Sequence, residues 1–263
     1  MFRVMSYNTL FGGFDGADAR RFDLQADLIA AADPDILLVQ EWKTFLADGQ
    51  ARQFAAERRL DRRALVAEAP ATGQNTAILV KPTVEVLRFE ADNTHFHHVA
   101  AIARLRPAGH AQPVTVASVH LCPNGQEVRL RETTYLAALA DENGHVLIGG
   151  DFNSVSPHDP EPALGDLPAR FRFRYADAAG KADHRTLQAL ERAGFVDLGH
   201  RLEAAPTPTV PGASFTGTEF VPFRCDYLMA SPTLAASASN YGVVRTETAG
   251  AASDHYPITC EFG

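Results

Sequence analysis

The chain has 263 residues, of which 46% are hydrophobic, so it can bury one large core or at most two small ones. Its formal net charge of −8 argues against a protein that coats nucleic acid by bulk electrostatic attraction. A nucleic-acid substrate is still compatible with this charge, because a local basic lip or bound metal ions could supply the attraction. The three cysteines, Cys122, Cys225 and Cys260, form no metal-ligand doublet and argue against a disulfide framework.

No segment is long and apolar enough to cross a bilayer, and we expect no membrane partner. The first eight residues, MFRVMSYN, read as a strand rather than as a signal peptide. We therefore expect a cytoplasmic protein, unless a signal was removed, and no protein partner is evident.

In chain order, apolar runs and helical spacings alternate along the whole sequence, with no repeat, low-complexity tract or convincing linker. Helices are predicted over residues 20–32, 45–60, 127–141 and 184–193. Strands are predicted over residues 2–7, 36–41, 65–69, 77–80, 84–89, 99–105, 114–120 and 146–149, and near residues 225–229 and 256–261. Strands and helices mix without a strict βαβ rhythm. This pattern indicates an α/β fold of layered mixed sheets in one domain over residues 1–263.

Two segments have competing interpretations. Residues 157–177 are expected to be irregular, and they contain the run RFRFRY at 170–175. This run is predicted to be an edge strand, although Arg170, Arg172 and Arg174 could also contact nucleic-acid phosphates. His95, His97 and His98 could ligate a metal, but no acid or cysteine lies close in sequence. A strand entering the core is the preferred interpretation of that histidine cluster.

Polar side chains stand at the ends of six apolar runs. They are Asn8, Glu41, His120, Asp151 with Asn153, Asp226, and Asp254 with His255. A strand that ends in such a group places it at the rim of its sheet, where neighbouring strands can bring several of them together. The sequence therefore predicts a polar site at one rim.

These residue types suit metal-assisted hydrolysis of a phosphoester. Carboxylate and amide oxygens are the ligands that Mg²⁺ or Mn²⁺ prefers. A histidine can donate to phosphate oxygens, and Asp226 can orient one imidazole. Asp151 can accept the proton of an attacking water, while Asn153 can donate to an oxyanion without adding charge.

Six short motifs contain these polar residues in order. They are YNTL at 7–10, VQE at 39–41, SVHL at 118–121, GDFNS at 150–154, RCDYL at 224–228 and SDH at 253–255, and together they run from residue 7 to residue 255. This ordered set resembles that of the endonuclease/exonuclease/phosphatase superfamily, which includes deoxyribonuclease-like and sphingomyelinase-like phosphoesterases. The resemblance implies a four-layer sandwich in which two packed mixed β-sheets are flanked by helices.

The resemblance also implies residue roles. Glu41 would be the principal metal ligand, with Asn8 and Asp254 in the metal and phosphate shell, and the cofactor would be Mg²⁺ or Mn²⁺. His255, held by Asp226, would contact the scissile phosphate, and His120 would face the phosphate or the leaving group. Asp151 would position or deprotonate the attacking water, with Asn153 supporting the transition state. The general base is left open between Asp151 and His255.

The chain departs from one branch of this superfamily. Abasic-site endonucleases carry an acid two places after the first Asn, and this chain has Leu10 there. One possible metal contact is therefore missing, which weakens that branch as the analogue.

Three functions follow from these patterns. The leading hypothesis is a divalent-metal-dependent phosphodiesterase or nuclease-like hydrolase acting on a phosphoester, for which nucleic acid is one candidate. The first alternative is a phosphomonoesterase acting on a small sugar, inositol or nucleotide phosphate. The second is a non-catalytic binding scaffold, which intact motifs disfavour.

Overall fold

The computed structural model describes residues 1–217 and 219–263. The strands are β1 (Phe2–Asn8), β2 (Ile36–Gln40), β3 (Arg63–Ala67), β4 (Thr76–Val80), β5 (Glu85–Asp92), β6 (Ala100–Arg106), β7 (Val114–His120), β8 (His145–Asp151), β9 (Val196–Asp197), β10 (Asp226–Ala230), β11 (Ala238–Val243) and β12 (Ile258–Phe262). The helices are α1 (Arg20–Ala32), α2 (Ala51–Leu60), α3 (Gln126–Ala137), α4 (Ala169–Tyr175), α5 (Arg185–Arg192), α6 (Leu198–Leu202), α7 (Pro232–Ala236) and α8 (Glu247–Ala252). Within these ranges, no helix is both long and apolar enough to span a membrane.

The strands form two six-stranded mixed sheets. The first sheet has the order β11-β12-β1-β2-β4-β3, and the second has the order β5-β6-β7-β8-β10-β9. In each sheet one central pair is parallel, β1 with β2 and β7 with β8, whereas the other neighbours are antiparallel. The parallel pairs make β1, β2, β7 and β8 the strands whose carboxyl ends can present polar residues together.

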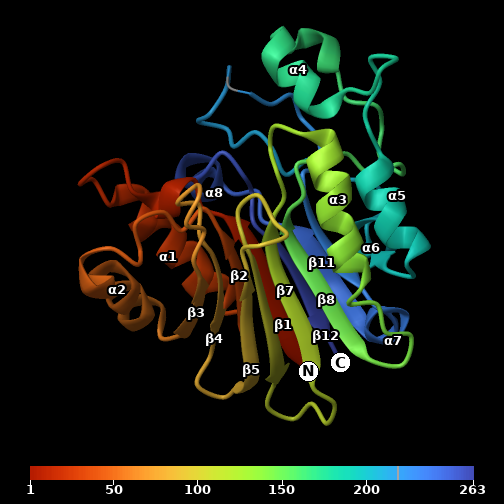
Figure 1. Cartoon of the computed structure of the whole chain (residues 1–263). Coiled ribbons are helices and arrows are strands. Elements are labelled where there is room, and N and C mark those ends of the chain that lie inside the picture. Colours follow the sequence, from red (N-terminus) through yellow and green to blue (C-terminus); the bar gives the residue numbers. More distant parts are fainter. Residues whose placement is uncertain (218) are drawn as a thin grey trace.

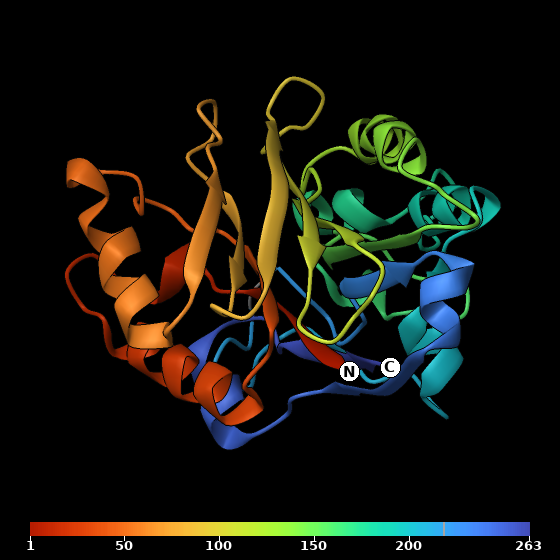
Figure 2. The same cartoon turned by 90° about the horizontal axis from the view of Figure 1, so that it is seen from below.

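The sheets pack face to face, and helices cover both outer faces (Figures 1 and 2). The central core between the sheets includes Val4 and Leu38 from the first sheet and Val116, Leu147 and Leu228 from the second. Helices α1 and α2 bury their apolar faces on the outer side of the first sheet, and α3 and α5 do so on the second. The central strands are thus buried on both faces, which explains their unbroken apolar runs. The predicted four-layer α/β sandwich is confirmed.

Two glycines allow β8 to carry Asp151 into the joint between the sheets. A Cβ at Gly149 would stand 2.6 Å from Cδ1 of Leu38 in the opposite sheet. Gly150 has a φ of 145°, and a Cβ there would stand 1.9 Å from the carbonyl oxygen of Val119 on the neighbouring strand. Only glycine fits both positions, because any side chain would push the strands apart just before the acid.

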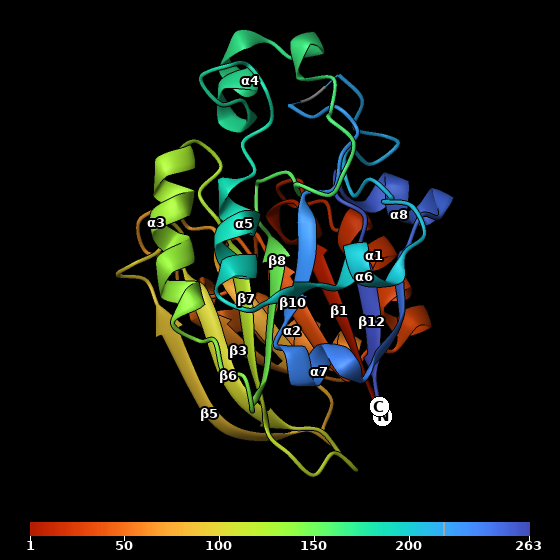
Figure 3. The same ribbon diagram turned by 90° about the vertical axis from the view of Figure 1, so that its right-hand side faces the viewer.

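Several local predictions differ from the structure. The run RFRFRY forms helix α4, so its prediction as an edge strand is wrong. Pro168, with a φ of −51°, precedes the helix, and Tyr175 at its end is buried with Phe220 and Phe223. The alternating run therefore forms a short helix above the rim, not a strand of either sheet (Figure 3). The predicted helix over residues 45–60 is shorter, because α2 begins only at Ala51.

Candidate active site

The polar residues predicted at the strand ends lie at one end of the two sheets, away from the chain termini (Figure 1). Asn8 ends β1, and Glu41 follows β2 directly. His120 ends β7 and Asp151 ends β8, in the second sheet. Asp226 begins β10, which is antiparallel to β8 and pairs Asp226 with Asp151. The site therefore forms where the two sheets meet.

A cavity of about 170 Å³ opens between these strand ends. The predicted site residues that line it are Glu41, His120, Asp151, Asn153, Asp254 and His255. The remaining two stand behind this lining. Nδ2 of Asn8 donates to Oε1 of Glu41 at 3.3 Å and to Oδ2 of Asp151 at 3.0 Å. Asp226 is hydrogen-bonded to His255. The structure thus brings all eight predicted residues into one connected cluster, while their roles stay predictions.

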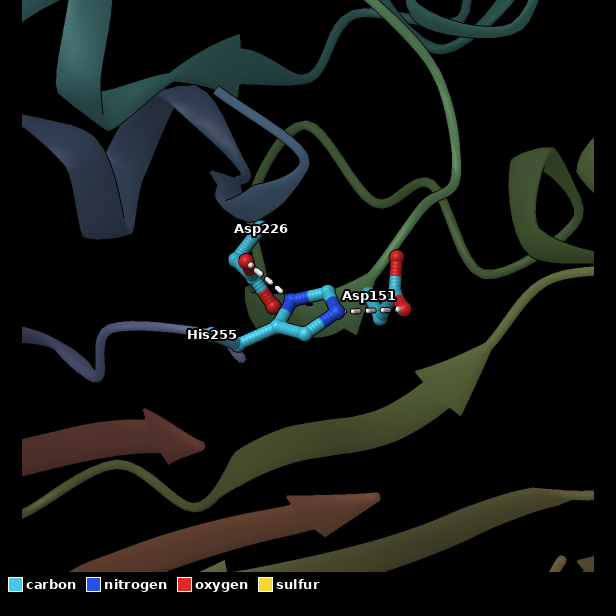
Figure 4. Close-up of side chains that lie close together, drawn as sticks. All are labelled: Asp151, Asp226 and His255. Carbon is cyan, nitrogen blue, oxygen red and sulfur yellow. Dashed lines mark hydrogen bonds and ion pairs between the residues drawn. The ribbon is translucent and has the colours of Figure 1, made fainter. Parts of the chain in front are cut away.

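The imidazole of His255 lies between two carboxylates (Figure 4). Its Nδ1 is 2.9 Å from Oδ2 of Asp226, and its Nε2 is 3.7 Å from Oδ2 of Asp151. Burial alone would lower the pKa of His255, but the charges of Asp226 and Asp151 outweigh it and raise that pKa well above 6.5. The two carboxylates therefore favour the protonated, cationic form of His255, and Asp226 holds the ring in place.

Asp151 is the acid nearest the centre of the cluster. Burial raises its pKa to about 6, and the charge of Asp226 adds to this, whereas His255 and hydrogen-bond donors oppose it. The backbone N–H of Asn153 donates to Oδ1 of Asp151 at 2.8 Å, and the Cys225 thiol donates to the same oxygen at 3.3 Å. A carboxylate with a pKa close to neutrality and a fixed orientation can accept a proton from water.

Glu41 and Asp254 supply the negative charge that a cation would need. The pKa of Glu41 is raised to about 7, mainly by burial. The charge of Asp254 and, less strongly, that of Asp151 also raise this pKa, whereas His255 and the N–H of Phe11 lower it. Among the described residues, no lysine or arginine forms an ion pair with these three acids. These hard oxygen donors, of which Asp151 also faces the His255 ring, fit Mg²⁺ or Mn²⁺.

Asp151, Asp226 and His255 also lie close enough together to hold a metal. However, Nδ1 of His255 is already hydrogen-bonded to Asp226, and the ring carries a positive charge. A cation therefore fits better beside Glu41 and Asp254. Asn8 turns its amide nitrogen toward Glu41 and Asp151, and its Oδ1 accepts from the Leu10 N–H at 3.2 Å. In this arrangement Asn8 orients the acids, and its predicted role as a ligand stays a prediction.

The backbone is strained around the cavity. Leu10, Phe11, Glu41 and Asn153 all have positive φ angles, of 45°, 59°, 62° and 47°. Residues other than glycine and asparagine rarely have a positive φ, and those that do are often found at functional sites. In this strained conformation the backbone N–H of Phe11 donates a hydrogen bond to Oε2 of Glu41 at 3.2 Å. The Leu10–Phe11 turn therefore helps to fix the Glu41 carboxylate.

His120 is a neutral imidazole on the wall of the cavity. Its Nε2 lies 3.4 Å from Oδ2 of Asp151, and its Nδ1 has no hydrogen-bond partner among the described residues. Burial lowers the pKa of His120 well below 6.5, and His98 and His255 lower it further. The cluster therefore has a charged end at His255 and an uncharged end at His120.

Helix α3 clamps two loops of the site with buried polar residues that the sequence analysis missed. Of the two leucines in this helix, Leu130 and Leu136, only Leu136 is fully buried. Glu132, with no exposed surface, accepts from the backbone N–H of His97 at 2.6 Å and of Cys122 at 2.9 Å. It thereby joins the loop before β6 to the loop after β7. The sequence did offer one signal of this role, which is the glutamate at an inward-facing position of the helix.

Arg129 continues this clamp toward α4. It is 1% exposed, and it donates to the carbonyl oxygens of Cys122, at 2.8 Å, and of Arg174. Arg174 itself lines the cavity and forms an ion pair with Glu219. Of the three α4 arginines, Arg174 therefore faces the site, and it does so with its charge already paired.

The histidine cluster of residues 95–98 is not a strand, so that prediction is wrong. These residues form a bend before β6, which begins at Ala100. His95 pairs with Asp92 outside the cavity, whereas His98 lines it beside His120. His98 is thus a site residue that the sequence analysis set aside. Trp42, directly after Glu41, stacks on Phe45 in the core.

A model of the Endonuclease/Exonuclease/phosphatase family matches residues 5–255. The chain belongs to this family. No sequence among curated proteins matches it. Among solved structures, the family fold recurs in a mannosyl-6-phosphatase from Bacteroides thetaiotaomicron, with 15% identity, a TM-score of 0.71 and complete coverage of both chains.

Two further solved structures of similar fold are named as an endonuclease and a phosphatase. An AP endonuclease from Archaeoglobus fulgidus has 18% identity and a TM-score of 0.70, covering 100% of this chain and 99% of that chain. A 3′ phosphatase from Neisseria, bound to a product DNA hairpin, has 18% identity, a TM-score of 0.68 and complete coverage of both chains. At these identities the likeness establishes the fold alone, and a phosphoesterase fold is common to all three.

Proposed function

We propose that this chain is a divalent-metal-dependent phosphoesterase that hydrolyses a phosphodiester. The observation that carries the proposal is the row Asp226–His255–Asp151 beside Glu41 and Asp254 in one cavity. The cationic imidazole of His255 is complementary to a phosphate. Asp151, whose pKa is about 6, can bind a water, and the carboxylates of Glu41 and Asp254 can bind a metal cation.

The residues divide the reaction among them. His255, kept protonated by Asp226, contacts a negatively charged phosphate oxygen and stabilises the charge that develops there. Asp151 orients the attacking water and accepts its proton, because its carboxylate lies within the same row and has a pKa of about 6. His120, on the uncharged side, faces the alcohol that leaves. Bound beside Glu41 and Asp254, Mg²⁺ or Mn²⁺ would neutralise phosphate charge and polarise the phosphorus–oxygen bonds.

A neighbouring hollow favours a diester over a smaller monoester. This hollow of about 290 Å³ shares Phe11 with the cavity and is also lined by Lys43 and Arg52. Lys43 stands over the Phe11 ring at 5.1 Å, and Arg52 stands over Phe14 at 4.3 Å. Neither cation has a carboxylate partner among the described residues. A substrate that continues past Phe11 with a second anionic group, such as a nucleic-acid strand, would use both cations.

A phosphomonoesterase is the second candidate, and the size of the cavity favours it. Phe220 and the Arg174–Glu219 ion pair line the cavity together with Phe11. A cavity of about 170 Å³ suits a small phosphate ester.

The test compares hydrolysis of bis-(p-nitrophenyl) phosphate, p-nitrophenyl phosphate and supercoiled plasmid, each with Mg²⁺, Mn²⁺ or EDTA. Wild type and Glu41→Ala are assayed together, with Glu142→Ala as an exposed-acid control. Metal-dependent turnover that Glu41→Ala abolishes is the expected result, with the diester or plasmid preferred. Preference for the monoester would favour the second candidate. No turnover by folded, metal-saturated protein would contradict the proposal and favour a non-catalytic scaffold.

A further inference from the structure

His98 is a buried polar residue of the cavity that the proposed reaction has not used. It lies in the bend between β5 and β6 and is 6% exposed. Its ring packs against that of His120, with centroids 4.4 Å apart and planes tilted by 34°. Both rings line the cavity. His98 therefore extends the row of site residues beyond His120, away from His255.

The hydrogen bonds around His98 occupy one ring nitrogen and leave the other open. Nδ1 lies 2.7 Å from Oγ1 of Thr72. The same hydroxyl oxygen accepts from the backbone N–H of Gln74 at 3.3 Å, and its own hydrogen can point toward Nδ1. In the neutral tautomer in which Nδ1 accepts that hydrogen, Nε2 carries the ring hydrogen. In this tautomer Nε2 of His98 is the donor edge of the ring.

This donor has no acceptor in the part of the chain that the structure describes. A buried N–H without a partner costs about 1–3 kcal/mol, so native proteins seldom leave one unused. The ring is neutral, because burial and the neighbouring His97 lower the pKa of His98 to about 4. The position is also held firmly, since Glu132 binds the backbone N–H of His97. A ligand oxygen is the missing partner of such a donor.

The side chains along the row indicate which part of a substrate would supply that oxygen. The His255 end lies beside Asp151, Asp254 and Glu41, the acids that suit a metal, so it fits the phosphate. The His120–His98 end presents imidazole rings rather than acids, which suits the uncharged alcohol part of an ester. A neutral N–H donor there discriminates by hydrogen bonding rather than by charge.

We propose that His98 determines substrate specificity, with its Nε2–H binding a second oxygen of the alcohol moiety, close to the ester oxygen. The proposal rests on the proposed function, and it narrows the substrate class to phosphoesters of polyols or sugars. Esters of simple alkyl or aryl alcohols lack this oxygen and leave the donor unpaired.

Two phosphonates that cannot be hydrolysed at the phosphorus–carbon bond test this without requiring turnover. They are 3-hydroxypropylphosphonate, which carries the second oxygen, and propylphosphonate, which does not. Their Kd values are measured by calorimetry with Mg²⁺ present, for wild type, His98→Phe and His98→Gln. His95→Phe is the matched control, because His95 lies on the same loop outside the cavity. The imidazole ¹⁵N signals of wild type report the tautomer of His98 independently.

We expect wild type to bind the hydroxylated phosphonate about three- to tenfold more tightly, as one neutral hydrogen bond allows. His98→Phe should bring the ratio of the two Kd values close to one, His98→Gln should restore part of it, and His95→Phe should leave it as in wild type. The same ratio in wild type and His98→Phe would overturn the proposal. So would failure of the hydroxylated ligand to bind, or a ring protonated at Nδ1 instead of Nε2. A protein that binds with this preference but hydrolyses no ester would instead refute the proposed function alone.

Discussion

Asn8 and Asp151 belong to different sheets, and Nδ2 of Asn8 donates to Oδ2 of Asp151 at 3.0 Å. The same amide group reaches Glu41, so one uncharged residue separates two carboxylates across the joint between the sheets. The bond between His255, which precedes β12, and Asp226, which begins β10, crosses this joint as well. The candidate site is therefore built from both halves of the sandwich.

Asn8→Asp should convert this separator into a further negative charge. Without metal, repulsion from Asp151 and Glu41 should lower the free energy of unfolding by about 1–2 kcal/mol, which corresponds to a fall in Tm of roughly 2–8 °C. Addition of Mg²⁺ should recover more Tm in the variant than in wild type. Differential scanning calorimetry with and without Mg²⁺ measures both effects. Asn143→Asp, which adds the same charge on the exposed loop before β8, should change little; equal losses in the two variants would contradict the account.

Asp226→Asn should remove the charge that keeps His255 protonated. The pKa of His255 should fall, so activity that depends on the imidazolium should be lost at a lower pH than in wild type. At neutral pH we expect kcat to fall by about 10²–10⁴-fold, the usual contribution of a positioned acid or base. The measurement is a pH–rate profile of the preferred ester, with Asp166→Asn as an exposed control. An unshifted alkaline limb would show that Asp226 does not set the charge of His255.

Binding of Mg²⁺ should depend on pH through Glu41, whose pKa is about 7 in the metal-free site. Below that pH the carboxyl is protonated, and affinity should fall by up to about tenfold per pH unit. Stability of the metal-free protein should show the opposite dependence. Because the folded-state pKa exceeds the ordinary value of 4.5, the extra stability is present below about pH 4.5 and is lost as the pH rises through 7.

Calorimetric titration of Mg²⁺ between pH 5.5 and 8, in parallel with Glu41→Gln, measures this dependence. The variant should bind weakly at every pH, without the slope that Glu41 contributes. A wild-type affinity that stays constant across the range would place the principal cation ligand elsewhere.

Glu132→Ala should loosen the wall of the cavity that carries His98. Two buried backbone N–H groups, those of His97 and Cys122, would lose their acceptor, at a cost of roughly 2–4 kcal/mol in the free energy of unfolding. Glu132→Gln keeps an acceptor oxygen and should lose less. Urea denaturation gives the stability, and KM should rise more than kcat falls if the effect is on the wall. The exposed Glu127→Gln on the same helix is the control, and a comparable loss there would argue against the clamp.

Arg224 should be essential to the stability of the segment that leads into Asp226. Its guanidinium is fully buried and donates two hydrogen bonds each to Asp159, at 2.8 and 2.9 Å, and to Asp197, both at 2.7 Å. Arg224→Met would leave two buried carboxylates without a counter-charge, at a cost of about 3–5 kcal/mol. Arg224→Lys keeps the charge but not the paired hydrogen-bond geometry, so its stability should lie between those of wild type and Arg224→Met. Chemical denaturation measures the order, and a lysine variant as stable as wild type would contradict it.

Much of the fold and of the site could be predicted because strand ends are visible in sequence. An apolar run that ends at Asn8, His120 or Asp151 indicates a buried strand and also marks where that strand reaches the rim of its sheet. Both sheet faces are covered, so the runs are unbroken and easily recognised. The order of the motifs then connected these rims to one family.

The features that escaped prediction depend on contacts between distant segments. His98 has a site role only because Thr72 and His120 meet it in space, and nothing in HFHHV distinguishes it from His95. Glu132 was missed because helical periodicity favours apolar residues on the inner face, whereas this helix buries an acid to bind two loops. The pattern RFRFRY alternates like a strand, but no sheet edge is available at that position, so local packing of Tyr175 prevails.

The hydrogen bonds from Asn8 to Asp151 and from His255 to Asp226 join the two halves of the sandwich. A ligand that tightens them should slow amide hydrogen exchange in β1 and β8 over their whole length, including residues far from the cavity. Occupancy of the site could then be detected in the most protected amides of the protein, through the global opening that breaks the two sheets apart.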